Sequence, residues 1–371
     1  MLLRARHNDE RFERQSSQAG LKQAVAAFVA LMALGILSGC GSFFSSSSSP
    51  SHLAYVAGGL TDVTAYRIDN KSGAPSSIVT APYVAGNSPS SIVVHPSNKF
   101  LYVANAADST ISLFSINSGS GTLTEVLPRT TSGFSPGFMT MDSAGKFLFV
   151  ANQSSNDVSM FQIGTAGALT LVSSVSVGSI PAGLVLSSAG FLYVPVPNFS
   201  VIAVLSVSSS SLQFVGSYLV TNGVGGIAVD PGAKFLYATN PATNTVSGFA
   251  IQAGGGLVAM PGLTVATGTT PVAAAVNLAG SALYVANSGA ANVSQFTVDS
   301  TTGVLTAFVA GSVVAGTNPA FLVVDPGGKF IFVGNTGSNS VTELAVASDG
   351  SVTSGNTINV AFVPRSFAAT Q

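Results

Sequence analysis

The chain has 371 residues, of which 47% are hydrophobic and only 7% are charged, and it contains 40 glycines. Its formal net charge is −1 and no basic cluster follows residue 22, which excludes the electrostatic footprint of a nucleic-acid-binding protein. The single cysteine, Cys40, excludes a disulfide framework, a thiolate zinc cluster and a CxxCH haem attachment. We therefore expect no metal, no cofactor and no nucleic-acid partner.

Residues 1–39 have the layout of an export signal. Five basic residues lie within the first 22, residues 24–37 are wholly apolar or glycine, and Leu37-Ser38-Gly39-Cys40 closes the segment. The apolar run is too short to span a bilayer comfortably. The segment resembles a bacterial lipoprotein signal with its lipobox, which implies that Cys40 is diacylated and becomes the mature N-terminus. The alternative is a free cysteine at the end of an N-terminal anchor helix.

The implied lipid anchor predicts where the protein resides. By the same resemblance, Gly41 after Cys40 is not the type retained at the inner membrane, so we expect lipid attachment to the outer membrane of the bacterial cell envelope, facing the periplasm or the cell surface. Residues 40–51 then form a lipidated, serine-rich tether. The predicted division is a signal peptide at 1–39, this tether, and one domain at 52–371.

One phrase, FLYVAN, recurs with small variations throughout the predicted domain. Its aromatic position returns every 44 to 48 residues, at Tyr55, Tyr102, Phe149, Tyr193, Tyr237, Tyr284 and Phe332. Seven repeats of this length predict a single closed ring. Within a repeat, runs such as SSIVVH, FLYVAN, TISLFSI and LTEVL are separated by clusters of Gly, Pro, Asn and Ser. This pattern indicates four short strands, the content of one propeller blade.

The first repeat lacks an inner strand, because the domain enters directly at HLAYVAG. Residues 360–369, VAFVPRSFAA, begin another repeat and then stop. Pairing this C-terminal segment with the first repeat would remove an exposed sheet edge. We therefore predict an all-β fold, a seven-bladed β-propeller of four-stranded blades whose ring is closed by the C-terminal segment, and we expect a monomer.

FLYVAN, with the NxVSxF pattern that follows it in several repeats, resembles the YVTN repeats and the seven-bladed lactonase-type propellers, the group that includes 6-phosphogluconolactonase. The resemblance extends over residues 52–369. It implies a lactone hydrolase whose charged groups, often with a histidine, lie in a pocket at the channel mouth. The matching loops here offer Asn, Ser and Gly, which favours a non-catalytic propeller that binds an envelope protein or carbohydrate. Both hypotheses stay open.

An asparagine closes the FLYVAN phrase in five repeats. These residues are Asn105, Asn152, Asn240, Asn287 and Asn335. One interpretation is a ring of amides that hydrogen-bonds a sugar or a peptide, and the other is a local Asx turn at each strand end. Recurrence by blade is typical of a structural role, because a single asymmetric ligand does not require it.

Charged residues break the repeat at a few positions. Asp62, Asp108 and Asp157 lie in loops of three successive blades, and Arg129 closes the second blade. Arg365 follows a blade-opening proline, where other blades have a small or apolar residue. Together they predict one charged site for ligand binding or lactone hydrolysis, in which Arg365 holds a carboxylate or phosphate. The alternatives are carboxylates that form turns and an arginine solvated near the C-terminus.

Overall fold

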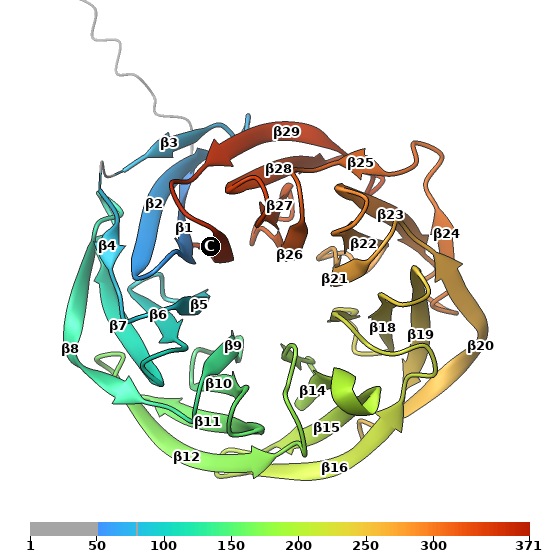
Figure 1. Ribbon diagram of the computed structural model, residues 1–371, viewed down its shortest axis with the longest axis horizontal. Helices are drawn as coiled ribbons and strands as arrows, with labels where there is room; N and C mark the ends of the chain where they lie inside the picture. The colour runs from blue at the N-terminus through green and yellow to red at the C-terminus, as the bar shows by residue number, and fades with distance from the viewer. Residues whose placement is uncertain (1–50, 79–80) are drawn as a thin grey trace, which may run out of the picture. The chain divides into compact units, whose positions relative to one another are not determined.

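Turn chemistry at both ends of each FLYVAN phrase folds every repeat into an antiparallel meander. The computed structural model describes residues 51–78 and 81–371, so the predicted signal peptide, Cys40 and nearly all of the predicted tether lie outside the described residues. The described residues form seven antiparallel sheets arranged in a ring, which confirms the predicted seven-bladed β-propeller (Figure 1). No helix within these ranges has the length and apolarity needed to cross a bilayer.

Four strand positions recur from the axis of the ring to its rim (Figure 1). The inner strands of blades 1 to 7 are β30 (Pro364–Ala369), β5 (Pro89–Val94), β9 (Pro136–Met141), β13 (Val185–Leu186), β17 (Ile227–Val229), β21 (Pro271–Val276) and β26 (Pro319–Val324). The second strands, which carry the FLYVAN phrase, are β1 (Ser51–Gly58), β6 (Phe100–Asn105), β10 (Phe147–Asn152), β14 (Phe191–Val196), β18 (Phe235–Asn240), β22 (Ala282–Asn287) and β27 (Phe330–Asn335).

The other two positions complete each blade. The third strands are β2 (Asp62–Asp69), β7 (Thr110–Ile116), β11 (Asp157–Ile163), β15 (Val201–Val207), β19 (Thr245–Ile251), β23 (Asn292–Val298) and β28 (Ser340–Val346). The outer strands are β3 (Pro75–Ser77) with β4 (Tyr83–Val84), β8 (Leu123–Thr131), β12 (Leu169–Ser176), β16 (Leu212–Leu219), β20 (Leu257–Ala266), β24 (Leu305–Ala307) with β25 (Val313–Val314), and β29 (Val352–Asn359). A short 3-10 helix, η1 (Pro197–Phe199), follows β14.

The inner strand of blade 4 is shortened by a proline in its neighbour. Pro195 stands in β14 where FLYVAN has alanine. Proline has no N–H to donate to a sheet ladder. The pairing of β13 with β14 accordingly covers only Val185 and Leu186, and the chain before them is irregular.

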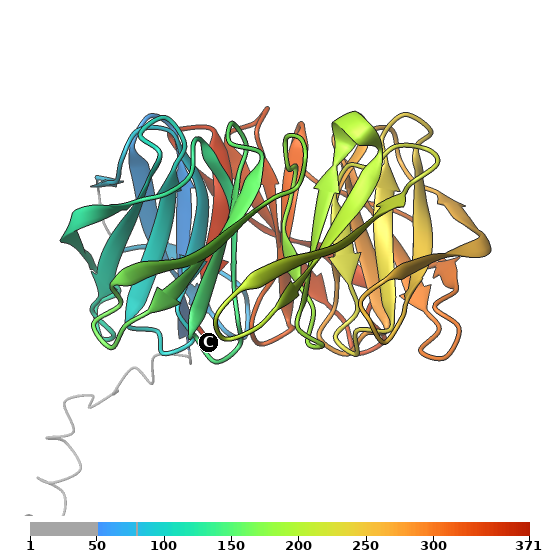
Figure 2. The same cartoon turned by 90° about the horizontal axis from the view of Figure 1, so that it is seen from below.

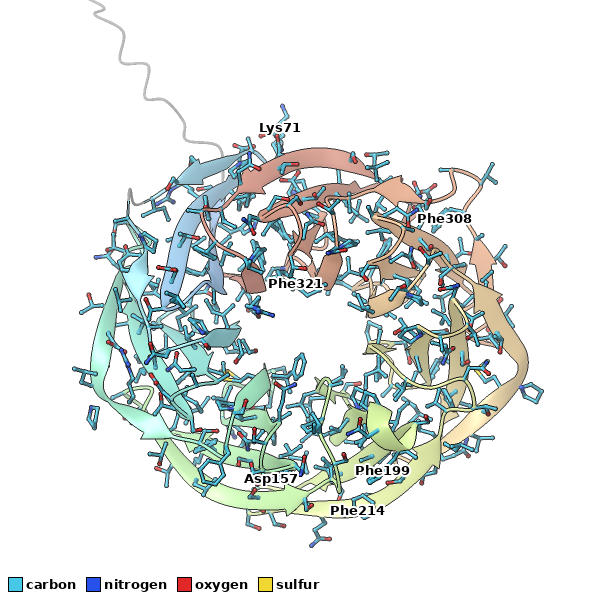
Figure 3. All side chains as sticks on the ribbon, viewed as in Figure 1. Lys71, Asp157, Phe199, Phe214, Phe308 and Phe321 are labelled. Atoms are coloured by element: carbon cyan, nitrogen blue, oxygen red, sulfur yellow. The ribbon has the colours of Figure 1, made fainter. Side chains whose placement is uncertain are left out.

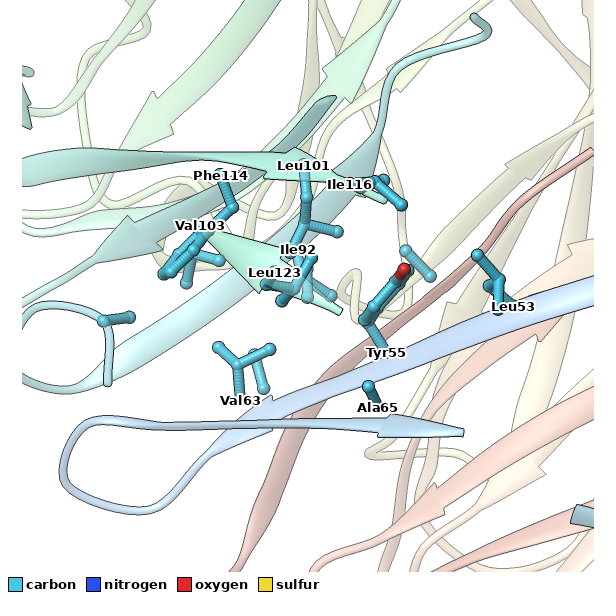
Figure 4. Close-up of a cluster of buried hydrophobic side chains, with 13 residues drawn as sticks. Leu53, Tyr55, Val63, Ala65, Ile92, Leu101, Val103, Phe114, Ile116 and Leu123 are labelled. Atoms are coloured by element: carbon cyan, nitrogen blue, oxygen red, sulfur yellow. The ribbon is translucent and has the colours of Figure 1, made fainter. Parts of the chain in front are cut away.

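The second strands form the core because both of their faces pack against other strands. In β6, residues 101–104 have no exposed surface. Successive side chains of a strand point to opposite sides, so a strand covered on both sides needs an unbroken apolar run. Figure 4 shows one cluster, in which Tyr55 and Val63 of blade 1 pack with Val103 and Phe114 of blade 2. The FLYVAN phrase is therefore the signature of this doubly buried position.

The recurring tyrosine ties five of the seven blades to the next one, whereas blades 3 and 7 have Phe149 and Phe332 at this position. Its hydroxyl donates to a glycine carbonyl in the following blade, in the turn between the third and outer strands. The pairs are Tyr55 with Gly121, Tyr102 with Gly167, Tyr193 with Gly255, Tyr237 with Gly303, and Tyr284 with Gly350, at 2.6–3.0 Å. Burial raises the pKa of Tyr193 and Tyr284 to about 12, so these phenols stay neutral donors.

Blade 7 has Phe332 in the tyrosine position, and a carboxylate takes the place of the missing hydroxyl. Glu343 on β28 lies opposite Phe332 and is 2% exposed. Its carboxylate packs against Gly73, in the β2–β3 turn of blade 1, and the Asn356 amide approaches both carboxylate oxygens at 3.4 and 3.5 Å. Burial raises the pKa of Glu343 above its usual range, and the charge of Asp325 raises it further.

This raised pKa predicts that Glu343 costs the protein stability as the pH rises. Below the ordinary value of 4.5 the carboxyl is protonated in both the folded and the unfolded chain. Above it the unfolded chain ionises first, so the free energy of unfolding falls until the folded-state pKa is passed. We expect the difference in free energy of unfolding between Glu343→Gln and the wild type to shift in favour of the variant between pH 4 and pH 8, as measured by urea denaturation.

Two other residues serve as references for the Glu343→Gln variant: one is a natural amide at the equivalent position, and the other supplies a control substitution. Gln295 stands at the equivalent position of blade 6, where its Oε1 accepts a hydrogen bond from the Val352 N–H at 2.8 Å, so the blade geometry accommodates an amide. Glu125, on the outer strand β8, supplies the control variant Glu125→Gln, which should change stability by less than about 1 kcal/mol at either pH. A difference for Glu343→Gln that does not vary with pH would contradict the prediction.

The C-terminal strand β30 closes the ring as predicted. It pairs with β1 in a register that runs from Ala54 opposite Ala369 to Gly58 opposite Pro364. On its other side, the Ser366 hydroxyl accepts a hydrogen bond from the backbone N–H of Ile92, in β5 of blade 2, at 3.1 Å. The last strand is thus bonded to two blades that are formed by the beginning of the domain.

The ring has two distinct faces because all second strands run in the same direction. We call the face that carries the loops between second and third strands the upper face. β1 begins at Ser51 on the lower face and reaches the upper face at Gly58, and β30, which is antiparallel to it, begins at Pro364 on the upper face. Figure 2 shows the ring edge-on, with the C-terminus at the lower face.

Candidate functional site

A pocket of about 420 Å³ opens on the upper face. Its walls come from four consecutive blades of the closed ring, blades 7, 1, 2 and 3. The inner strands contribute their first residues, and the loops after β1, β6, β10 and β27 contribute the rim. The residues that line it include Ser88, Ser90, Phe138, Gln153, Phe321, Thr336 and Arg365. This is the kind of concave site at which propellers and other folds bind small molecules.

Arg365 brings the one charged side chain among the described residues that line the pocket. It is the second residue of β30, directly after Pro364, and its side chain is exposed. The ion pairs found within residues 51–78 and 81–371 both belong to Arg129, so the guanidinium of Arg365 is not neutralised by a carboxylate there. A planar guanidinium with free donors can hold a carboxylate through two parallel hydrogen bonds.

The three candidate aspartates do not converge on Arg365. Asp62 begins β2, and its carboxylate packs against Gly59 at the rim of the pocket. Asp108 accepts hydrogen bonds from the Asn87 backbone and side chain at 2.7 and 2.8 Å, which lower its pKa. Asp157, which is labelled in Figure 3, accepts from Asn152 at 2.6 Å within blade 3. None of the three aspartates lines the pocket with Arg365, and Asp62 contacts one lining residue, Gly59.

Arg129 lies on the outer strand β8, at the periphery of the ring, and interacts with two carboxylates. Its guanidinium donates to both oxygens of Glu125 at 2.7 and 3.3 Å and lies 3.8 Å from Asp108. The hydrogen bond that Arg129 donates to Glu125, with the charges of both carboxylates, raises the pKa of Arg129. This arginine therefore has carboxylate partners within blade 2, and it is separate from the pocket-lining residues.

The five recurrent asparagines lie inside the blades, with no exposed surface. Asn105 shows the arrangement: its Nδ2 donates to the hydroxyls of Thr110 and Ser112 at 3.1 Å, and its Oδ1 accepts from the Gly86 N–H at 3.0 Å. Asn152, Asn240, Asn287 and Asn335 likewise bond to the residues five and seven positions later. Each amide joins the second and third strands, and Asn105 also holds the connection from the preceding blade. These hydrogen bonds reach further along the chain than those of an Asx turn. None of the five amides is exposed, so none is available to a ligand at the surface.

Several pocket residues were not predicted from the sequence. Gln153 and Thr336 directly follow the recurrent asparagine, and Phe138 and Phe321 stand two residues after a blade-opening proline. One signal pointed to Phe321: its blade has Gly334 where FLYVAN has alanine, and a Cβ at Gly334 would overlap the ring of Phe321. A departure from the repeat on one strand therefore marks a bulky residue on the next.

The described residues contain no group of three or more His, Cys, Asp or Glu side chains placed to hold a metal ion. Within the pocket itself, the described lining offers hydroxyls, one primary amide, one guanidinium and two phenyl rings. Such a set can bind an anion and cover an apolar surface. The expectation of no cofactor stays a prediction.

Comparisons with known proteins agree with this architecture. A family model described as "Lactonase, 7-bladed beta-propeller" matches residues 42–182 and 197–323. No curated protein matches the chain. Among solved structures, a candidate 6-phosphogluconolactonase of Bacteroides fragilis is 22% identical, with a TM-score of 0.75 over 88% of this chain and 99% of its own.

Two further solved structures are similar to the same extent. The periplasmic gluconolactonase of Pseudomonas aeruginosa is 20% identical, with a TM-score of 0.73 over 87% of this chain and 99% of its own. A protein of Lactobacillus plantarum is 16% identical, with a TM-score of 0.75 over 87% and 100%. Identities this low show the shared fold alone, whereas the family match spans well over half of the sequence. The chain therefore belongs to the lactonase family of seven-bladed β-propellers.

Proposed function

We propose that this protein is a ligand-binding propeller of the bacterial cell envelope, anchored by lipid at Cys40, whose binding site is the upper-face pocket around Arg365. The observation that supports it most is the state of Arg365, an exposed guanidinium in a pocket of about 420 Å³ whose described lining includes no carboxylate. A cation in such a place has its charge and donors available for an external anion.

The first described residue of the domain lies on the face opposite the pocket. The domain begins at Ser51 on the lower face, whereas Gly59 and Arg365 lie at the upper face. A lipid-anchored protein of the envelope would meet its ligand there, either free or as part of an envelope carbohydrate or protein.

Lactone hydrolysis is the second candidate function, and it is favoured by family membership and by the contact of Asp62 with Gly59, a residue that lines the pocket. In that reaction the Asp62 carboxylate would take a proton from water, the water oxygen would attack the lactone carbonyl, and Arg365 would stabilise the oxyanion. The ring C–O bond would then break, and Asp62 would return its proton to the departing alkoxide. The described lining of the pocket contains no carboxylate, imidazole or thiol, which favours binding over this chemistry.

One set of measurements on the full chain, purified from the envelope, separates these functions. Binding is measured by the shift in unfolding temperature over a panel of carboxylates, sugar acids and lactones, and lactone consumption is followed on the same samples. We expect an anion to stabilise the wild type but not Arg365→Gln, with no lactone consumed. Turnover that is lost in Asp62→Asn would instead support the hydrolase. Absence of any stabilising anion would refute the binding proposal.

The anchor has a separate test. Cells that express the protein are fed a fatty acid carrying an alkyne tag, and the purified chain is examined for the tag. The wild type should carry it and should sediment with membranes, whereas Cys40→Ser should lose both properties, because a thiol is required for the acyl attachment. A tagged Cys40→Ser variant would contradict lipidation at this cysteine.

A further inference from the structure

Three of the four uncharged polar side chains that line the pocket already donate hydrogen bonds within the protein, and the exposed Ser88 is the exception. The Ser90 hydroxyl donates to the backbone carbonyls of Pro136 and Ala104 at 2.6 and 3.2 Å. The Thr336 hydroxyl donates to the Asn318 carbonyl at 3.0 Å, and the Gln153 amide reaches the Pro181 carbonyl at 3.4 Å. These bonds join neighbouring strands and blades, so a ligand would have to break them to use the same donors.

A sugar acid is poorly matched to such a lining. Each hydroxyl that it brings into the pocket gives up hydrogen bonds to water and needs a replacement from the protein. The side chains that could supply replacements are those of Ser88, Ser90, Thr336 and Gln153. All but that of Ser88 already donate to backbone carbonyls. A phosphosugar adds a dianion, whereas the described lining carries one cation, Arg365.

The walls of the pocket suit an apolar body instead. Phe138 enters from β9 of blade 3 and Phe321 from β26 of blade 7, so the two rings approach from opposite ends of the lining. Figure 3 shows Phe321 at the inner end of its blade, beside the axis of the ring. Both rings are partly exposed. Phenyl rings gain most from flat apolar groups that cover their faces or edges.

From these observations we propose that the pocket selects a monocarboxylate with a flat apolar body, an arylacetate or a similar acid, over sugar acids and phosphosugars. The carboxylate pairs with the Arg365 guanidinium, and the apolar body lies against Phe138 and Phe321. This inference rests on the proposed binding function and specifies the chemical class of its ligand. It follows from three properties of one site: a single cation, hydroxyls of which only that of Ser88 is not bonded within the protein, and two partly exposed phenyl rings.

The test is calorimetric titration of the full chain, purified in mild detergent, with phenylacetate, phenylacetamide, gluconate and 6-phosphogluconate. We expect phenylacetate to bind at least about tenfold more tightly than gluconate, and the neutral amide to lose at least about tenfold relative to phenylacetate, since it lacks the charge. Arg365→Gln should weaken phenylacetate about tenfold or more. Phe321→Ala and Phe138→Ala should each weaken phenylacetate severalfold and leave the weak binding of gluconate unchanged.

The controls keep the two proposals distinguishable. Phe199→Ala changes a phenyl ring that is 57% exposed and does not line the pocket, and it should leave every affinity unchanged. If gluconate or 6-phosphogluconate binds more tightly than phenylacetate and depends on Arg365, the ligand class is wrong and the binding function stands. If none of the four probes binds with dependence on Arg365, the ligand class is overturned and the proposed function falls with it unless another anion of the panel binds there.

Discussion

Phe367→Ala should lower the free energy of unfolding by about 3–5 kcal/mol, the usual cost of emptying a buried phenylalanine site. Phe367 lies in the closing strand β30, is 3% exposed, and stacks on Phe332 of blade 7 with ring centroids 4.2 Å apart. The substitution removes the contact that joins the last strand to the blade before it. Urea denaturation followed by circular dichroism measures the loss.

The matched control for this experiment is another phenylalanine on a strand of the same ring. Phe214 on the outer strand β16 is 51% exposed, and Phe214→Ala should cost less than about 1 kcal/mol. If Phe367→Ala cost no more than this control, the closing strand would not contribute to the stability of the ring as we describe. A large loss confined to Phe367→Ala supports the C-terminal strand as the closure.

Asn105→Ala should cost about 2–4 kcal/mol, because it leaves the buried Gly86 N–H without an acceptor and frees two hydroxyls from their donor. The same substitution should leave ligand affinity in the Arg365 pocket unchanged, since Asn105 has no exposed surface. Denaturant unfolding and calorimetric titration of one protein sample give both quantities. The pair of results separates a structural amide from a binding amide.

An exposed asparagine of the same face serves as the control. Asn198 lies in η1 of blade 4, near the place where that blade lacks the recurrent asparagine, and its amide donates to the Ser179 hydroxyl at 3.0 Å on the surface. Asn198→Ala should change stability by less than about 0.5 kcal/mol. A stable Asn105→Ala variant that had lost its ligand would revive the hypothesis of amides that bind a sugar or a peptide.

The fold could be predicted from the sequence because the strand that forms the core of each blade recurs seven times. A strand buried on both faces needs an apolar run, and the tyrosine needs a glycine carbonyl in the next blade, so the phrase returns at the length of one blade. Closure was also predictable, because Pro364 begins a blade that the chain does not finish. Physical constraints that act on every blade leave a periodic pattern.

The site was only partly predictable, because it depends on single residues that break the pattern. Arg365 stood out as a charge among small residues, and the structure places it in the pocket. Spacing alone could not show that Arg129 pairs with Glu125 or that Asp157 bonds inside its own blade, since both depend on side-chain direction. Gln153 and Phe321 gave weaker signals because uncharged departures from a repeat are common.

The most direct test of the account is a crystal structure of the protein with phenylacetate. The account predicts that the carboxylate lies within hydrogen-bonding distance of the Arg365 guanidinium, roughly 2.7–3.1 Å, with the ring against Phe138 and Phe321. Density for the ligand at another place, or an empty pocket at a saturating concentration, would contradict the claim that function resides in the upper-face pocket around Arg365.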